Sequence, residues 1–505
     1  MDLNNVPTSG NSWLLRKVLR DEWGFAGFVV SDAFAIGNLV IQGHARDKRD
    51  AALRSLKAGL NMDMASGSYL ESLADLVNDG SLSMAQIDEM VRPILTIKVR
   101  MGLFEHPYVD ETLLDKVAAK PEHRQAARLT AQRSMVLLRN EGGLLPLAKN
   151  LKNVAVIGPL ADSMEATEGS WLAFGHKPAA VTVLQGIRAK LPNAKISYAP
   201  GPQIRRDFAS FFEDLGLVEK KPVQPPEEAE QAFQVAVKTA RGADLVVAVL
   251  GENADMAGEA ASRGSIDLPG RQEELLKTVC ALGKPVVLVL LNGRPLSINW
   301  ASQNVPAILE AWEPGTEGGN AVADILFGDA NPGGKLPVCF PRHGSHAPLY
   351  YARTLSHQPE GSPMYRSRYW DSPATPLYPF GFGLSYTTFA ITNLKVAESK
   401  IKIGQAVVVS ADVTNTGKVA GDEVVQLYIH QKWGTDSRPA HELKGFSRIT
   451  LQPGETKTVS FKLGADALSY WSTNAGKVIQ DAAEFDIWVG SDSLATLHAD
   501  LQVVE

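Results

Sequence analysis

The chain has 505 residues, of which 45% are hydrophobic and 21% are charged, and its formal net charge is -6. This composition is typical of a folded protein with about three domains, and it excludes a mainly disordered chain. No segment approaches the roughly 18 apolar residues of a membrane span, and no basic stripe suits a phosphate backbone, which excludes membrane insertion and nucleic-acid binding.

The first hundred residues alternate between helical and strand patterns. The pattern predicts, in order, a helix at 11–20, a strand at 28–31, a helix at 50–57, a strand at 60–64 and two further helices. The last helix should begin at a capping box, Ser83 to Gln86, and bend at Pro93. Such alternation is typical of an α/β barrel or a doubly wound sheet. Two strands do not close an eight-stranded barrel of roughly 250 residues, so we expect the rest to precede residue 1.

The middle of the chain contains three nearly continuous apolar runs, at residues 154–158, 244–251 and 285–293. Runs of this kind mark strands that are covered on both faces, as in a parallel sheet. The segment 328–336 partly matches a phosphate-binding loop, but an extra glycine precedes Lys335 and Leu336 occupies the Ser/Thr position. We therefore predict an α/β sandwich domain without a nucleotide site.

From Leu384 onward the apolar residues alternate with polar ones, as in Val407, Val409, Ala411 and Val413. A period of two with turn residues between the runs predicts a β-sandwich of about 120 residues. The whole chain is thus predicted to be an α/β protein with five segments: part of a (β/α)8 barrel at 1–104, a linker at 105–121, an α/β sandwich domain at 122–342, a connecting segment at 343–383 and a fibronectin type III-like β-sandwich at 384–505.

Two cysteines, Cys280 and Cys339, and ten scattered histidines offer no disulfide framework and no metal-ligand spacing. We expect neither a metal nor a cofactor. The opening residues lack the basic and apolar regions of a signal peptide, but this does not decide the compartment if the chain begins partway through a domain.

Carboxylates follow two of the predicted strands. Asp32 stands at the end of the strand 28–31, where α/β barrels place catalytic groups, although an aspartate there also commonly caps the next helix. The strand ending at Leu250 leads into a loop with Glu252, Asp255 and Glu259, at the edge where open α/β sheets bind ligands. A solvated acidic loop is the alternative. Two such carboxylates at one pocket would suit glycoside hydrolysis, in which one attacks the anomeric carbon and the other protonates the leaving oxygen.

Two tryptophans, Trp171 and Trp312, are candidates for stacking on a sugar face. A buried tryptophan is more often part of a core. We favour Trp171 as a wall of the pocket.

At these residues the chain resembles glycoside hydrolase family 3, and within it the periplasmic β-glucosidases of Gram-negative bacteria. The resemblance runs almost from end to end, through LLRKVLRDEWGF (14–25), VSD (30–32), AG (58–59), MGLF (101–104), SMVLLRNE (134–141), AVIGP (155–159), AWEPGTEGGN (311–320), GGKLP (333–337) and YPFGFGLSYTTF (378–389). It implies the order barrel, α/β sandwich, fibronectin type III-like domain. It also implies that residue 1 falls just before the seventh barrel strand.

The resemblance assigns roles to particular residues. The nucleophile of the family, the aspartate of its Ser-Asp motif, falls on Asp32, and the acid/base falls on Glu259, with Glu252 as the fallback. Trp171, Arg263 and Glu252 are expected to bind substrate. Many members have Trp after Ser-Asp, whereas this chain has Ala33, which leaves the shape of the subsite open.

The sequence therefore predicts a retaining, exo-acting β-glucosidase that needs no metal and takes a small glycoside or an oligosaccharide. The complete enzyme is expected to be periplasmic or secreted, and a homodimer is considered beside a monomer. The main alternative is a catalytically inert fragment that keeps a sugar-binding or packing surface. An N-acetylglucosaminidase of the single-domain kind is disfavoured, because such enzymes typically use a barrel histidine and lack the sandwich.

Overall fold

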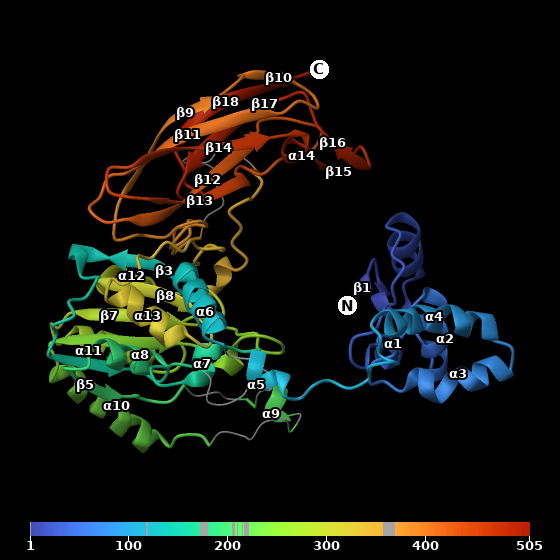
Figure 1. The fold of residues 1–505 in the computed structure, drawn as a ribbon, viewed down its shortest axis with the longest axis horizontal. Helices are drawn as coiled ribbons and strands as arrows, with labels where there is room; N and C mark the ends of the chain where they lie inside the picture. The colour runs from blue at the N-terminus through green and yellow to red at the C-terminus, as the bar shows by residue number, and fades with distance from the viewer. Residues whose placement is uncertain are drawn as a thin grey trace. The chain divides into compact units, whose positions relative to one another are not determined.

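A computed structural model describes residues 2–117, 120–171, 180–204, 208–209, 211–214, 216, 222–356 and 369–505. The chain forms two compact units, Met1–Ala118 and Ala119–Glu505, which are described separately (Figure 1). The division between them lies within the predicted linker 105–121, where the structure also has a short helix, α5 (Leu113–Val117). None of the helices in the described ranges combines the length and apolar character that crossing a membrane requires.

The first unit is mainly helical. An antiparallel hairpin of β1 (Asp2–Leu3) and β2 (Val6–Pro7) is followed by η1 (Thr8–Gly10), the π-type helix η2 (Trp13–Glu22), α1 (Ala35–Ile41), α2 (Lys48–Ala58), α3 (Ser68–Asn78) and α4 (Met84–Arg100). The predicted capping box is present, since the Ser83 and Gln86 side chains each bond the other's backbone, and α4 continues past Pro93 to Arg100. Its core contains buried residues of α1 to α4, including Ile36, Leu56, Leu76 and Met90.

The two strands predicted in this unit are reduced to one parallel bridge between Val30 and Met62. Ser31 N donates to Met62 O at 2.9 Å, and Met62 N donates to Val29 O at 3.1 Å. Among the described residues, this bridge is not extended into a longer ladder. The side chains of Val30 and Met62 are 41% and 45% exposed, although barrel strands normally bury such residues.

The second unit begins with a six-stranded sheet in the order β3-β8-β7-β6-β4-β5 (Figure 1). Five strands are parallel, namely β4 (Asn153–Ile157), β5 (Lys195–Ala199), β6 (Leu245–Gly251), β7 (Val286–Leu291) and β8 (Ala307–Trp312), and β3 (Val136–Asn140) is antiparallel to β8. The three apolar runs of the sequence are β4, β6 and β7, which confirms the prediction of a parallel sheet.

Helices cover both faces of this sheet. Buried residues of α6 (Pro121–Ser134), α8 (Val183–Lys190) and α13 (Gly318–Leu326) pack on one face. Those of α10 (Pro226–Arg241), α11 (Gln272–Cys280) and α12 (Asn299–Asn304) pack on the other. The remaining short helices of this part are η3 (Glu141–Gly143), α7 (Met164–Glu168), α9 (Phe211–Asp214), η4 (Ala254–Met256) and η5 (Gly344–His346).

The C-terminal part is the predicted β-sandwich. One sheet has the order β10-β18-β17-β12-β13 and the other β14-β11-β9, with a separate hairpin of β15 and β16. The elements are β9 (Phe389–Val396), β10 (Lys400–Lys402), β11 (Val407–Asn415), β12 (Gly421–Gln431), β13 (Glu442–Leu451), β14 (Thr456–Leu463), α14 (Ala465–Leu468), β15 (Tyr470–Ser472), β16 (Lys477–Ile479), β17 (Glu484–Gly490) and β18 (Leu497–Val504). The alternating residues Val407, Val409, Ala411 and Val413 are buried between the sheets.

Buried polar contacts join the sandwich to the α/β part. Lys335 Nζ lies 2.9 Å from Glu423 Oε1 and donates to Gly383 O at 2.9 Å. Lys335, the lysine of the segment that partly matches a phosphate loop, therefore has a structural role, and it links the two parts of the second unit through a buried ion pair.

Candidate active site

Loops that follow four parallel strands meet at one edge of the sheet in the second unit. Parallel strands end at the same edge, and this edge is where such sheets bind ligands. Gly293, after β7, lies against Ala257 in the loop after β6, so closely that a Cβ atom at Gly293 would be only 2.7 Å from the Ala257 Cβ. Ser170 Oγ, in the loop after α7, donates to Glu313 Oε1, after β8, at 3.1 Å. The predicted acidic loop therefore lies among the loops of three other strands.

Glu252, directly after β6, is buried between two guanidinium groups. Its side chain is 1% exposed, and Arg263 Nη1 donates to its Oε1 at 2.7 Å. Arg294 Nε lies 3.2 Å from the same oxygen and 3.3 Å from Oε2. Arg263 also donates to Asp267 O at 2.9 Å. Both oxygens of Glu252 are thus occupied by protein groups, and Arg263 bonds the protein rather than open solvent.

Glu259 is exposed in the same loop. The residues on either side have positive φ angles, +92° at Gly258 and +54° at Ala260. Glycine adopts this conformation at no cost, whereas it strains alanine. Glu259 is thus exposed where the backbone of the loop turns, whereas Glu252 is buried at the start of the loop.

Trp171 is 66% exposed, and it lies beside the loop of Glu259, since a Cβ on Gly258 would be 3.3 Å from its Nε1. Trp312 differs. Its ring packs near Phe340, with the ring centroids 6.0 Å apart, among the residues of the core on one face of the sheet. Of these two tryptophans, Trp171 is therefore the one whose ring is exposed at this edge.

A second buried carboxyl group, Glu310 in β8, was not among the carboxylates predicted from the sequence. It is fully buried, and its Oε1 accepts a hydrogen bond from Trp312 N at 2.9 Å. Asn292 Nδ2 lies 3.2 Å from both of its oxygens. Burial raises the pKa of Glu310 to about 8, and the nearby charge of Glu252 acts in the same direction. A glutamate within an otherwise apolar strand was the signal for this group.

Asp32 belongs to the first unit and ends the short segment paired at Val30. The buried Ser31 fixes the backbone there, because its Oγ donates to Asp32 O at 2.8 Å and accepts from Met64 N at 2.9 Å. The Asp32 side chain is exposed, and its Oδ1 accepts a hydrogen bond from Ala33 N at 2.7 Å. The backbone of Asp32 is thus fixed by hydrogen bonds, while its carboxylate is exposed.

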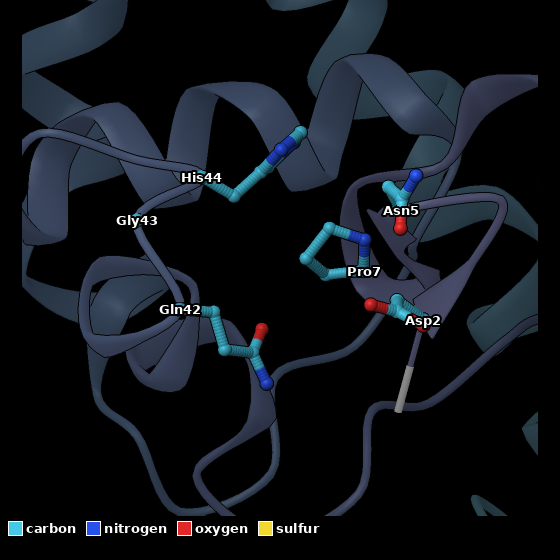
Figure 2. A pocket seen from close by; sticks show the side chains of 6 residues that line it. All are labelled: Asp2, Asn5, Pro7, Gln42, Gly43 and His44. Atoms are coloured by element: carbon cyan, nitrogen blue, oxygen red, sulfur yellow. The ribbon is translucent and has the colours of Figure 1, made fainter.

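A cavity of about 230 Å³ also opens in the first unit. Figure 2 shows Gln42 and His44, which follow α1, on one side of it and Asp2, Asn5 and Pro7 of the N-terminal hairpin on the other. Asp32 is not among the residues that line it. The cavity therefore does not coincide with the predicted nucleophile.

In the described part of the chain, one group of side chains has the spacing to hold a metal ion: Asp486, His498 and Asp500 in the β-sandwich. The ammonium group of Lys432 lies 3.2 Å from Asp486 and 3.0 Å from Asp500. This ammonium group already forms ion pairs with both carboxylates.

Comparison with known proteins identifies the class. Residues 1–97 match the N-terminal domain of glycosyl hydrolase family 3, residues 135–386 match its C-terminal domain, and residues 423–493 match a fibronectin type III-like domain. The chain belongs to glycoside hydrolase family 3, and it combines an N-terminal domain fragment, an α/β sandwich and a fibronectin type III-like domain.

Individual relatives extend this result. A periplasmic β-glucosidase of Salmonella typhimurium is 44% identical over 99% of this chain and 66% of its own length. A β-xylosidase of Formosa agariphila is 40% identical over 98% of the chain and 67% of its own length. The crystal structure of a Listeria innocua β-glucosidase with glucose has a TM-score of 0.88 and 34% identity, covering the whole chain and 66% of that protein. The chain thus spans about two thirds of these relatives.

Proposed function

We propose that this chain provides the catalytic residues of a retaining, exo-acting β-glucosidase that removes terminal non-reducing β-D-glucosyl residues. The observation that carries the proposal is a pair of exposed carboxylates: Asp32 follows the parallel bridge at Val30, and Glu259 lies in the loop after the parallel strand β6. Catalytic carboxylates of α/β enzymes occupy such positions. The names of the Salmonella and Listeria relatives support glucose as the sugar, whereas that of the Formosa relative leaves xylose as a rival.

In the proposed reaction, Asp32 attacks the anomeric carbon while Glu259 donates a proton to the leaving oxygen. The aglycone departs, and a glycosyl ester on Asp32 remains. Glu259, now a carboxylate, removes a proton from water, which attacks the same carbon and releases Asp32. Two inversions retain the β configuration. Retaining enzymes hold their two carboxyl groups about 5–5.5 Å apart, and the mechanism requires this spacing in the complete enzyme.

Within the loop after β6, we assign the acid/base role to Glu259 rather than Glu252. A proton donor must reach the glycosidic oxygen. Glu252 is 1% exposed and faces two arginines, so its carboxylate is engaged before any substrate arrives. Trp171 would stack on the sugar, while Arg263 would act on the site through Glu252. We further propose that the enzyme works outside the cytoplasm, in agreement with the periplasmic relative.

The test uses a complete enzyme, made by joining the preceding part of the Salmonella relative to this chain. Proton NMR of the fresh product should show β-glucose first, because double displacement retains configuration. Initial α-glucose would overturn the retaining mechanism. If the complete enzyme releases no sugar, the inert-fragment alternative gains support, since Asp32 and Glu259 would then be present without function.

A further inference from the structure

We propose that Arg294 is a positioning residue that holds the loop of Glu259 in its working shape. The inference rests on the proposed function, because it concerns the placement of the proposed acid/base. Arg294 follows β7, so it belongs to a different strand and loop from Glu259.

The guanidinium group of Arg294 bonds the loop on both sides of Glu259. Its Nη2 donates to Ala261 O at 2.9 Å and also to Met256 O. Met256 precedes Glu259 by three residues, and Ala261 follows it by two. One side chain therefore ties together the two ends of the segment that carries the acid/base.

Arg294 is itself fixed from two directions. Its Nε faces Glu252 at 3.2 Å, and its own carbonyl oxygen accepts a hydrogen bond from Asn292 Nδ2 at 2.8 Å. Glu252 also binds Arg263, at the far end of the same loop. A planar guanidinium can bond a carboxylate and two carbonyl groups in fixed directions at once, which the point charge of a lysine does not reproduce.

The loop needs such support because its own sequence supplies little. Around Glu259 it contains Gly258 and three alanines, Ala257, Ala260 and Ala261, which offer little side-chain surface for packing. Ala260 is held at a positive φ that an alanine adopts only under constraint. Displacing a catalytic group by about 1 Å can lower the rate on the order of 100-fold. The hydrogen bonds of Arg294 therefore hold the part of the loop in which a small shift of Glu259 would lower the reaction rate.

The test compares Arg294→Met and Arg294→Lys in the complete enzyme on two substrates. A misplaced acid should lower kcat/KM by roughly 100-fold for an alkyl glucoside, which needs protonation, but only a few-fold for a 2,4-dinitrophenyl glucoside, which does not. The lysine variant should recover part of the loss. Arg271→Met, which removes a partly exposed arginine paired with Glu230 and Glu274, is the matched control and should behave as the parent.

Hydrogen exchange in the 505-residue chain gives a readout that does not need activity. In Arg294→Met, the amides of residues 257–262 should exchange roughly 10-fold faster while those of β6 and β7 stay unchanged. Equal losses on both substrates, or an unchanged exchange rate in the loop, would overturn the positioning role alone. A complete parent enzyme that cleaves no β-glycoside would overturn the proposed function together with it.

Discussion

Arg263 donates a hydrogen bond of 2.7 Å to Glu252, whose side chain is 1% exposed. Removing one partner of a buried ion pair leaves a charge without compensation, at a cost of about 3–5 kcal/mol. We expect Glu252→Ala to lower the melting temperature of the second unit clearly in scanning calorimetry. Glu259→Ala, in the same loop but exposed, is the control and should change stability by no more than about 0.5 kcal/mol. Equal stabilities for the two variants would contradict the structural role of Glu252.

Glu259 and Glu252 should also differ in catalysis, because one is the proposed acid/base and the other holds the loop in place. In a complete enzyme, Glu259→Ala should still form the glycosyl-enzyme from a dinitrophenyl glucoside, since a good leaving group needs little protonation. Azide should then resolve the intermediate and raise kcat. Glu252→Ala should lose activity without rescue by azide, because its effect passes through the shape of the loop. The reverse pattern would move the acid/base role to Glu252.

Glu310 predicts a pH dependence of stability. Its pKa is raised by burial to about 8 in the folded protein and returns to the ordinary range on unfolding. As the pH rises, the unfolded chain therefore releases the Glu310 proton at a lower pH than the folded protein does. The contribution of Glu310 to the free energy of unfolding is complete below about pH 4.5 and is lost as the pH rises to about 8. Glu310→Gln stays neutral and should remove this loss, with a difference of a few kcal/mol over the range. Calorimetry at several pH values measures the stability of both proteins. The same dependence of stability on pH in the parent and in Glu310→Gln would refute the prediction.

Trp171 should contribute to sugar binding and not to folding. Its ring is 66% exposed, so Trp171→Ala removes little buried surface and should leave the melting temperature unchanged. Stacking on an aromatic ring is worth about 0.5–1.5 kcal/mol, which corresponds to a rise in KM of roughly 2- to 10-fold for a β-glucoside. Trp312→Ala, in the core beside Phe340, is the contrasting variant and should destabilise the protein. A large fall in the melting temperature with Trp171→Ala would make it a packing residue instead.

The isolated 505-residue chain should have negligible glucosidase activity. Val30 and Met62 form a single bridge, and their side chains are 41% and 45% exposed, so the apolar side chains beside Asp32 are only partly covered. We expect faster hydrogen exchange across residues 1–104 than beyond residue 122, where both parts have large buried cores. Parent-like turnover by the purified chain, without any added N-terminal polypeptide, would show that the first unit already forms a working site.

The sequence by itself determined the elements whose signal is local. The apolar runs that became β4, β6 and β7 reflect burial on both faces, and the period of two in β11 reflects burial on one. The capping box at Ser83 is a contact between residues three apart, so it too is readable along the chain. Membership of the family followed from motifs spread over nearly the whole length.

Only the tertiary structure decided which side chains share an environment. Glu252 and Arg294 are 42 residues apart and meet because β6 and β7 are neighbours whose ends lie at one edge of the sheet. The same arrangement made Glu252 a buried ion-pair partner and left Glu259 exposed, although both are glutamates of one acidic loop. The pKa of Glu310 is raised because β8 lies between β3 and β7 and its side chain is buried under the packed layers. Local patterns record periodicity and burial, whereas the pairing of charges depends on strand order, which no local pattern contains.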